Sequence, residues 1–202
     1  MAEKVRVAVL ISGRGSNMLA LSEYKRRDPE RNYEIVLVAS NVPAARGLVL
    51  AKRLGIKTWS KSHQGMTRDE FDDALDAVLR AHEVELVALA GYMRLLSDGF
   101  VARWAGRMLN IHPSLLPLHK GLDTHQRAIV AGDEHGGCSV HLVTADLDSG
   151  PVLAQARVRI LPRDDADSLA ARVLEEEHRL YPIALEDYCR ALREVEETGD
   201  DG

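Results

Sequence analysis

Residues 5–17, VRVAVLISGRGSN, decide the fold class of the chain. Val5–Ile11 is a nearly continuous run of aliphatic, mostly β-branched residues, which is typical of a strand covered on both faces in a parallel sheet. The glycine-containing loop 12–17 follows directly, and residues 18–27 after it have the apolar spacing of a helix. A strand, a loop and a helix in this order predict the first unit of an α/β fold.

The same alternation continues through the first half of the chain. Further strands are expected at 33–39, 57–60 and 85–90, and further helices at 44–54 and 69–82. The last of these helices opens with Thr67-Arg68-Asp69-Glu70, a capping box in which Thr67 and Glu70 each satisfy a free amide. The pattern predicts an α/β fold with a doubly wound, mostly parallel central sheet and helices on both faces, in a Rossmann-like arrangement.

After Gly91 the alternation loosens. Strands are expected at 107–112, 138–144 and 152–161, and closing helices at 167–181 and 183–195. The two helices are separated at Pro182, because proline has no amide hydrogen and its ring clashes with the preceding turn. Residues 194–202 hold five acids and no base, so we expect a disordered acidic tail over 196–202.

Size, charge and cysteine content narrow the function classes. A chain of 202 residues is expected to form a single domain, here 1–202. The net charge of −5 comes from the acidic end, so the body has no basic footprint for nucleic acid or an anionic membrane. The only cysteines, Cys138 and Cys189, indicate free thiols in a reducing compartment, and no signal peptide or membrane span is recognisable. A cytoplasmic protein is therefore expected.

The loop 12–17 has the properties of an anion site. It joins a strand to a helix N-terminus, where free amides and the helix dipole favour negative charge, and a phosphate monoester would fit. Dinucleotide binding is an alternative, since Gly13 and Gly15 match the first half of its fingerprint, but Met18 occupies the position of the third glycine. A purely structural glycine turn is the other alternative.

Residues 110–117, NIHPSLLP, carry the strongest indication of catalysis. Asn110 and His112 lie two apart on an expected strand, so both side chains point to one face. The amide can donate a hydrogen bond to an oxyanion and the imidazole can transfer a proton near neutral pH, a combination that suits acyl transfer. Asp148 lies between two expected strands and is either a turn former or a partner of His112.

A metal site is the competing interpretation of the histidines. His112, His119, His125 and His141 lie within thirty residues, but their spacing matches no zinc signature and no cysteine pair accompanies them. No metal is therefore expected. Cys138 is expected to be a buried, unreactive thiol rather than a nucleophile.

Taken together, the motifs resemble the phosphoribosylglycinamide formyltransferases, a family of folate-dependent formyltransferases. The motifs are SGxGSN at 12–17, AGYMR at 90–94, NIHPSLLP at 110–117, SVH at 139–141 and LDxGP at 147–151. The resemblance implies transfer of the formyl group of 10-formyltetrahydrofolate to the amine of glycinamide ribonucleotide in purine biosynthesis, with small molecules as partners and no metal. A formyltetrahydrofolate hydrolase, which shares the Asn, His and Asp trio, is the alternative.

The same resemblance implies a role for each matching residue. The catalytic trio would be Asn110, His112 and Asp148. The ribonucleotide would be held by Gly13, Gly15, Ser16, Asn17 and Glu177. The folate would be bound by Arg68, Met93, Arg94, Leu95, Leu96, Asn110, Thr144 and Asp148, with the rest of the 144–148 loop. The chain departs from the family at Asp123, where many members have His, and at Lys120, where many have Pro. We also expect the Asp148 carboxylate to raise the pKa of His112. The protein is expected to be a monomer or a homodimer.

Overall fold

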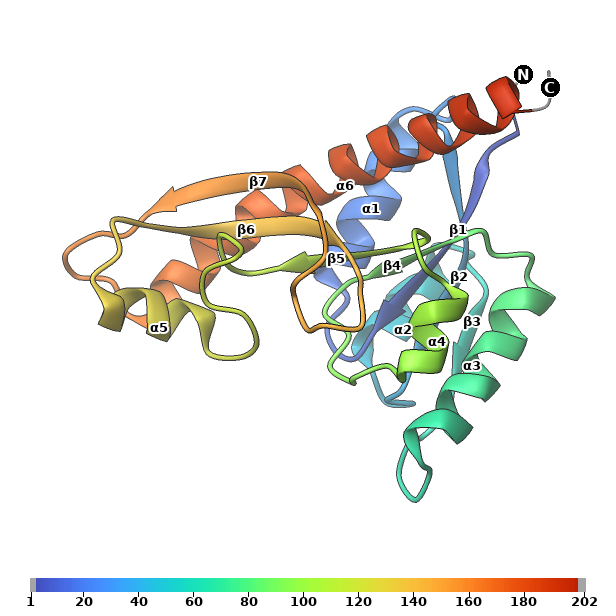
Figure 1. Ribbon diagram of the computed structural model, residues 1–202, viewed down its shortest axis with the longest axis horizontal. Helices are drawn as coiled ribbons and strands as arrows, with labels where there is room; N and C mark the ends of the chain where they lie inside the picture. The colour runs from blue at the N-terminus through green and yellow to red at the C-terminus, as the bar shows by residue number, and fades with distance from the viewer. Residues whose placement is uncertain (1–2, 200–202) are drawn as a thin grey trace.

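A seven-stranded sheet extends through the molecule in the order β3-β2-β1-β4-β5-β6-β7 (Figure 1). The computed structural model describes residues 3–199. The strands are β1 Val5–Ile11, β2 Tyr33–Ser40, β3 Thr58–Ser60, β4 Leu86–Leu89, β5 Met108–His112, β6 His135–Leu142 and β7 Val152–Arg159. Strands β1 to β5 pair in parallel, whereas β6 and β7 are antiparallel to their neighbours. The predicted doubly wound, mostly parallel sheet is confirmed.

The helices cover both faces of this sheet. They are α1 Ser16–Arg27, α2 Arg46–Arg53, α3 Arg68–Ala81, α4 Asp98–Arg103, α5 Thr124–Ala131 and α6 Ala166–Gly199. The expected capping box is present at the start of α3, where Thr67 accepts from the Glu70 amide and Glu70 accepts from the Thr67 amide. Helices α4 and α5 were not predicted, because six and eight residues are too few to show a clear helical period.

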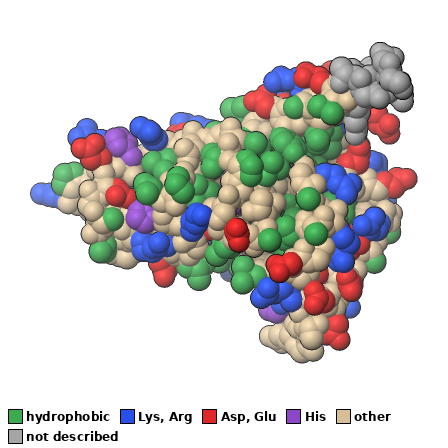
Figure 2. All heavy atoms as spheres, viewed as in Figure 1, with side chains coloured by type: hydrophobic (Ala, Val, Ile, Leu, Met, Phe, Trp, Pro, Cys, Tyr) green, Lys and Arg blue, Asp and Glu red, His purple; other side chains and the backbone are tan. Residues whose placement is uncertain are grey.

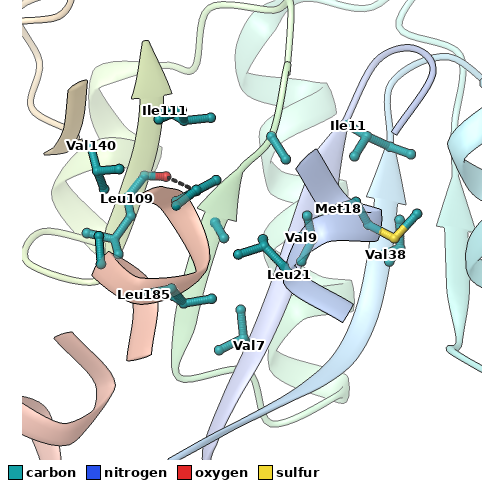
Figure 3. Packing of buried hydrophobic residues seen from close by; sticks show 14 of the residues in the cluster. Val7, Val9, Ile11, Met18, Leu21, Val38, Leu109, Ile111, Val140 and Leu185 are labelled. Atoms are coloured by element: carbon teal, nitrogen blue, oxygen red, sulfur yellow. Dashed lines mark hydrogen bonds between the residues drawn. The ribbon is translucent and has the colours of Figure 1, made fainter. Parts of the chain in front are cut away.

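Alternating side chains along β1 divide the core into two layers. Val7 and Val9 point to the face covered by α1, α2 and α6, whereas Ala8 and Leu10 point to the face covered by α3 and α4. Figure 3 shows Val7 and Val9 beside Leu21 of α1 in the first layer. A strand buried on both faces explains why the sequence of β1 is continuously apolar.

Helix α6 is continuous, so the predicted break at Pro182 is wrong. Tyr181 just before the proline and Leu185 just after it are both fully buried. The Tyr181 hydroxyl donates to the backbone oxygens of Leu89 and Leu109, at 3.1 and 3.3 Å. Burial on both sides of the proline outweighs one missing backbone hydrogen bond. The helix includes 196–199 of the predicted acidic tail, and 200–202 lie outside the described residues.

The surface shows no segregation of charge on the face in view. Figure 2 shows Lys and Arg side chains intermixed with Asp and Glu side chains over this face. Within residues 3–199, no helix combines the length and the apolar character needed to cross a membrane.

The helix layers decide where a site can form. Leu109 and Ile111 of β5 face the α6 layer, so Asn110 and His112 face the side of α3 and α4. In the described chain, the buried cluster under α3 and α4 takes only Met108 from β5 and no residue from β6. The side chains of β5 and β6 at the site are polar, and the loops 113–123 and 143–151 contact them.

Candidate active site

The structure brings His112, at the end of β5, against Asp148, in the loop before β7. The Nδ1 atom of His112 lies 3.4 Å from Oδ2 of Asp148, and each side chain is only 7% exposed. The Nε2 atom of His112 faces the backbone oxygen of His119 at 3.1 Å. Both ring nitrogens thus face hydrogen-bond acceptors, an arrangement that an imidazolium satisfies completely.

His141 links Asn110 to this pair. It lies opposite Asn110 in the β5–β6 register, and its Nε2 atom is 3.1 Å from Nδ2 of Asn110. Its Nδ1 atom faces the Leu142 oxygen at 2.8 Å; because a carbonyl only accepts, Nδ1 carries a hydrogen and a neutral ring accepts from Asn110. Nε2 is also 3.6 Å from Oδ1 of Asp148. One amide hydrogen of Asn110 is thereby oriented, and the other remains for a ligand.

Sequence reasoning gave His141 no catalytic role of its own. The available signal was the repeated spacing, since Ser139 and His141 are two apart on β6 just as Asn110 and His112 are on β5. In the antiparallel register, His112 pairs with Ser139 and Asn110 with His141, so all four side chains share one face of the sheet.

Burial lowers the pKa of His112 overall, although Asp148 raises it as predicted. Burial, which disfavours the imidazolium, is the largest cause, and the neighbouring His141 ring acts in the same direction. The His119 carbonyl and the Asp148 carboxylate oppose this shift without cancelling it. Sequence reasoning counted the carboxylate alone and had no measure of burial.

Asp148 remains a charged partner for this histidine. Burial raises the pKa of Asp148, but the adjacent His141 ring, the Gly121 amide and the charge of His112 together outweigh it and hold that pKa below its usual value. The Gly121 amide donates to Oδ2 of Asp148 at 2.9 Å. The carboxylate therefore stays ionised at neutral pH.

The loop 113–123 is anchored over the trio by β6 and β7. The Ser139 hydroxyl donates to the Ser114 oxygen at 2.6 Å and accepts from the Leu116 amide at 3.0 Å. The Gln155 amide donates to the Leu116 oxygen and to Ser139, at 2.9 and 2.8 Å. These contacts hold the loop in the position from which the His119 oxygen faces the imidazole.

The two departures from the family pattern lie on this same loop. Lys120 donates through Nζ to the Ser149 hydroxyl at 2.6 Å, beside Asp148. Asp123 has a left-handed backbone, with φ of 55°, and immediately precedes α5. Neither side chain contacts the imidazole of His112 in the described contacts.

The predicted phosphate loop and Glu177 come together across α1 and α6. Asn17 donates through Nδ2 to the Glu177 carboxylate at 2.7 Å, and both side chains are buried. The Oδ1 atom of Asn17 is buried without a hydrogen-bond partner among the described residues. Burial raises the pKa of Glu177, and the bond from Asn17 opposes this rise. Gly15, with φ of 78°, precedes the helix and provides no side chain to cap its amides.

The loops after β1 and β4 are tied together at the switch point of the sheet. The Ser12 amide donates to the Gly91 oxygen at 3.1 Å, and the Met93 amide donates to the Ser12 hydroxyl at 2.7 Å. The chain leaves β1 for β2 on one side and returns to β4 on the other, which creates the crevice where open α/β sheets bind ligands. The phosphate loop therefore lies beside the predicted folate loop.

The residues expected to bind folate occupy three segments. In the loop after β4, Met93 and Leu95 are exposed apolar residues, at 68% and 56%, and Leu96 packs on the α3–α4 core cluster. Arg94 lies with its guanidinium 4.9 Å from the centre of the Phe71 ring. The loop containing Thr144 reaches the trio through Asp148. Arg68 is exposed at the start of α3, and no described hydrogen bond or ion pair links it to the others.

Metal binding and thiol chemistry find no support at this site. Among residues 3–199, no group of three or more His, Cys, Asp or Glu side chains is arranged to hold a metal ion. His119 instead pairs through Nε2 with Asp133 at 2.6 Å, and burial lowers the pKa of His125. Cys138 is fully buried, and burial raises its pKa to about 12, as expected of an unreactive thiol.

Known proteins share both the sequence and the fold. The formyl transferase family matches residues 5–185. The chain is 41% identical to phosphoribosylglycinamide formyltransferase of Escherichia coli (strain K12), over 90% of this chain and 85% of that protein. A crystal structure of phosphoribosylglycinamide formyltransferase from Brucella melitensis is 49% identical with a TM-score of 0.87, covering 93% of this chain and 96% of that one.

Longer proteins also contain a matching region. The trifunctional purine biosynthetic protein adenosine-3 of Gallus gallus is 45% identical over 197 residues, which is 97% of this chain but 20% of that protein. The chain thus spans about a fifth of the length of these trifunctional relatives. From the family match over most of its length, and from relatives of this similarity, the chain belongs to the formyl transferase family.

Proposed function

We propose that this protein transfers the formyl group of 10-formyltetrahydrofolate to the amine of N1-(5-phospho-D-ribosyl)glycinamide. The products are formylglycinamide ribonucleotide and tetrahydrofolate, in the synthesis of purines. The observation that carries the proposal is the convergence of Asn110, His112 and Asp148 beside a helix N-terminus suited to a phosphate. The relatives of this chain named phosphoribosylglycinamide formyltransferase support it.

The proposed chemistry follows from the trio. The substrate amine attacks the formyl carbon, forming a C–N bond and a tetrahedral oxyanion, and the bond from that carbon to folate N10 then breaks. The free amide hydrogen of Asn110 and the imidazole of His112 stabilise the oxyanion. The amine loses one proton and N10 gains one, and Asp148 orients the water that carries it.

The lowered pKa of His112 suits this sequence. In the free protein, burial disfavours the imidazolium. An oxyanion close to the ring adds a negative charge to that of Asp148, which favours the protonated form. The electrostatic stabilisation is therefore greater in the transition state than in the ground state, which is the condition for catalysis.

Within this proposal, each substrate has its own part of the crevice. The amides after Gly15, with Ser16, Asn17 and Glu177, hold the phosphate and ribose. The folate lies against the loops 93–96 and 144–148, with no metal required. The chain acts as one formyltransferase domain, as a monomer or homodimer. Its buried, free cysteines suit the reducing cytoplasm.

A formyltetrahydrofolate hydrolase remains the second candidate, because it would use the same trio with water as acceptor. The crevice favours the transferase, since the buried Asn17–Glu177 pair and the uncapped helix start form a second polar subsite that water does not need. The two reactions differ in their dependence on the ribonucleotide.

The deciding experiment uses purified protein and 10-formyltetrahydrofolate, with and without glycinamide ribonucleotide. Tetrahydrofolate release is followed by absorbance, and the formylated product by mass spectrometry. Release that requires the ribonucleotide supports the transferase, whereas equal release in its absence identifies a hydrolase. His112→Asn should abolish the reaction, and His135→Asn, at an exposed residue of β6, is the matched control. No release under either condition would refute both functions.

A further inference from the structure

One buried acid has no part in the chemistry proposed above. Asp72, on α3, has no exposed surface. Its Oδ2 atom accepts the Ser97 amide hydrogen at 2.6 Å. Ser97 in turn caps α4, because its hydroxyl accepts from the Phe100 amide at 3.3 Å. A single carboxylate thus joins α3 to the end of the 91–97 loop and the start of α4, which lie on the same face of the sheet (Figure 1).

The same region contains three unpaired polar atoms. Among the described residues, Oδ1 of Asp72, the Tyr92 hydroxyl and Nε of Arg94 are buried without a hydrogen-bond partner. They are chemically complementary, since a carboxylate accepts, a guanidinium donates and a hydroxyl does both. The charges of Asp72 and Arg94 also act in opposite directions on the pKa of Tyr92, which burial raises, so the three groups lie within electrostatic range.

Arg94 is held from its outer side by the first turn of α3. Its Nη2 atom donates to the Thr67 oxygen at 3.1 Å, and its guanidinium lies over the Phe71 ring. The inner nitrogen, Nε, is the buried one. The side chain is therefore fixed against α3, within electrostatic range of Asp72.

Stability alone does not account for Asp72. Burial raises its pKa, against the opposing effects of Ser97 and Arg94, so the charged form is disfavoured in the folded protein. An unpaired buried carboxylate oxygen also costs free energy. A buried carboxyl group kept at such a cost, next to a loop expected to bind substrate, indicates a functional role.

We propose that Asp72 is a positioning residue for the folate-binding loop 91–97, holding Ser97 by a hydrogen bond and Arg94 by charge. The loop is thereby preformed for the formylfolate, and binding does not bear the full entropic cost of ordering it. This inference rests on the proposed function, because it assigns the loop to the folate. Asp72 itself does not touch the substrate.

The test compares Asp72→Asn with the control variant Asp73→Asn, at the adjacent position of α3. In the wild type, the Asp73 carboxylate is exposed and pairs with Arg103 at 2.9 Å. Asparagine keeps an oxygen for the Ser97 amide but removes the charge that faces Arg94. We expect the KM for 10-formyltetrahydrofolate to rise about tenfold, which corresponds to a loss of about 1.4 kcal/mol of charge interaction with Arg94. The KM for glycinamide ribonucleotide and kcat should change less than about twofold. Asp73→Asn should match the wild type.

Thermal unfolding separates this role from a structural one. The Asp72→Asn variant should have a Tm equal to or above that of the wild type, because a buried charge is lost, while tetrahydrofolate binds more weakly in a calorimetric titration. A lower Tm with both KM values raised together would show that Asp72 only supports the fold, and an unchanged folate KM would equally overturn the proposal.

A milder variant protects the test against misfolding. Tyr92→Phe removes one member of the cluster without adding volume, and it should raise the folate KM in the same direction by a smaller factor. If Asp72→Asn does not fold, an unchanged folate KM in folded Tyr92→Phe overturns the proposal. Wild-type protein without ribonucleotide-dependent transfer would instead refute the proposed function itself.

Discussion

Replacing Asp148 by Asn removes the charge that faces His112 while keeping the size of the side chain. The two residues are 3.4 Å apart and each side chain is 7% exposed, so solvent and salt screen their interaction only weakly. The variant should fold, because an amide oxygen still accepts the Gly121 amide hydrogen. The perturbation is therefore electrostatic.

The distance between His112 and Asp148 sets the size of their electrostatic interaction. Coulomb's law gives about 5 kcal/mol for unit charges 3.4 Å apart at an effective dielectric constant near 20. The amide dipole of asparagine replaces part of this interaction, which leaves a loss on the order of 2 to 3 kcal/mol when the imidazole is protonated in the transition state. We expect kcat at neutral pH to fall roughly 30- to 150-fold.

The effect of Asp148 on the pKa of His112 sets the direction in which the pH profile of the variant shifts. The carboxylate favours the imidazolium, so its removal moves the pKa of His112 further in the direction in which burial already lowers it. Activity that needs protonated His112 is lost as pH rises through that pKa, so the profile of the variant shifts to lower pH and activity partly recovers under mildly acidic conditions.

The assay is kcat against pH at saturating substrates, with NMR titration of the His112 ring in both proteins. Asp187→Asn, at an exposed position of α6, is the control. An identical His112 pKa in wild type and variant would refute the electrostatic reasoning and leave Asp148 a role through water or geometry alone.

Five further substitutions, at four positions, test other parts of the site. His141→Leu should lower kcat about tenfold, because the Asn110 amide loses the group that orients it. His141→Gln should lower kcat less, because glutamine keeps an acceptor for that amide. Equal kcat values in the two variants would show that His141 does not orient Asn110. Gly13→Ala should leave the fold intact, because no atom lies within 4 Å of the added Cβ, and should raise the KM for the ribonucleotide, because the methyl group occupies space in the phosphate loop. Gly15→Ala should mainly lower Tm, because its Cβ would lie 2.7 Å from a backbone carbon of α2. Glu177→Gln should raise Tm by about 2 to 4 °C at neutral pH, because burial raises the pKa of this carboxyl. Wild-type stability should fall as pH rises from the ordinary glutamate range through that raised pKa, and a variant with the same pH dependence would contradict this account.

Local sequence patterns were enough to predict the structure wherever one short segment forms its own contacts. The bounds of β1 are those predicted, because its continuous apolar run is what two-sided burial requires. The Thr67–Glu70 capping box is present for a similar reason, since its two hydrogen bonds join residues three apart. Pro182 shows the limit of this reasoning: its local preference predicted a break, but the burial of Tyr181 and Leu185 against distant strands maintains the helix.

In the candidate site, too, some features follow from the local sequence and others depend on tertiary contacts. The sequence alone identified Asn110 and His112 as neighbours on one strand face, because a period of two is a property of the strand itself. Only the tertiary structure placed His141 against Asn110, Glu177 against Asn17, and Asp148 against His112, since those pairs join segments that are distant along the chain. It also decided the direction of the His112 pKa shift, because a pKa depends on the water that the surrounding fold excludes, and no local pattern records that burial.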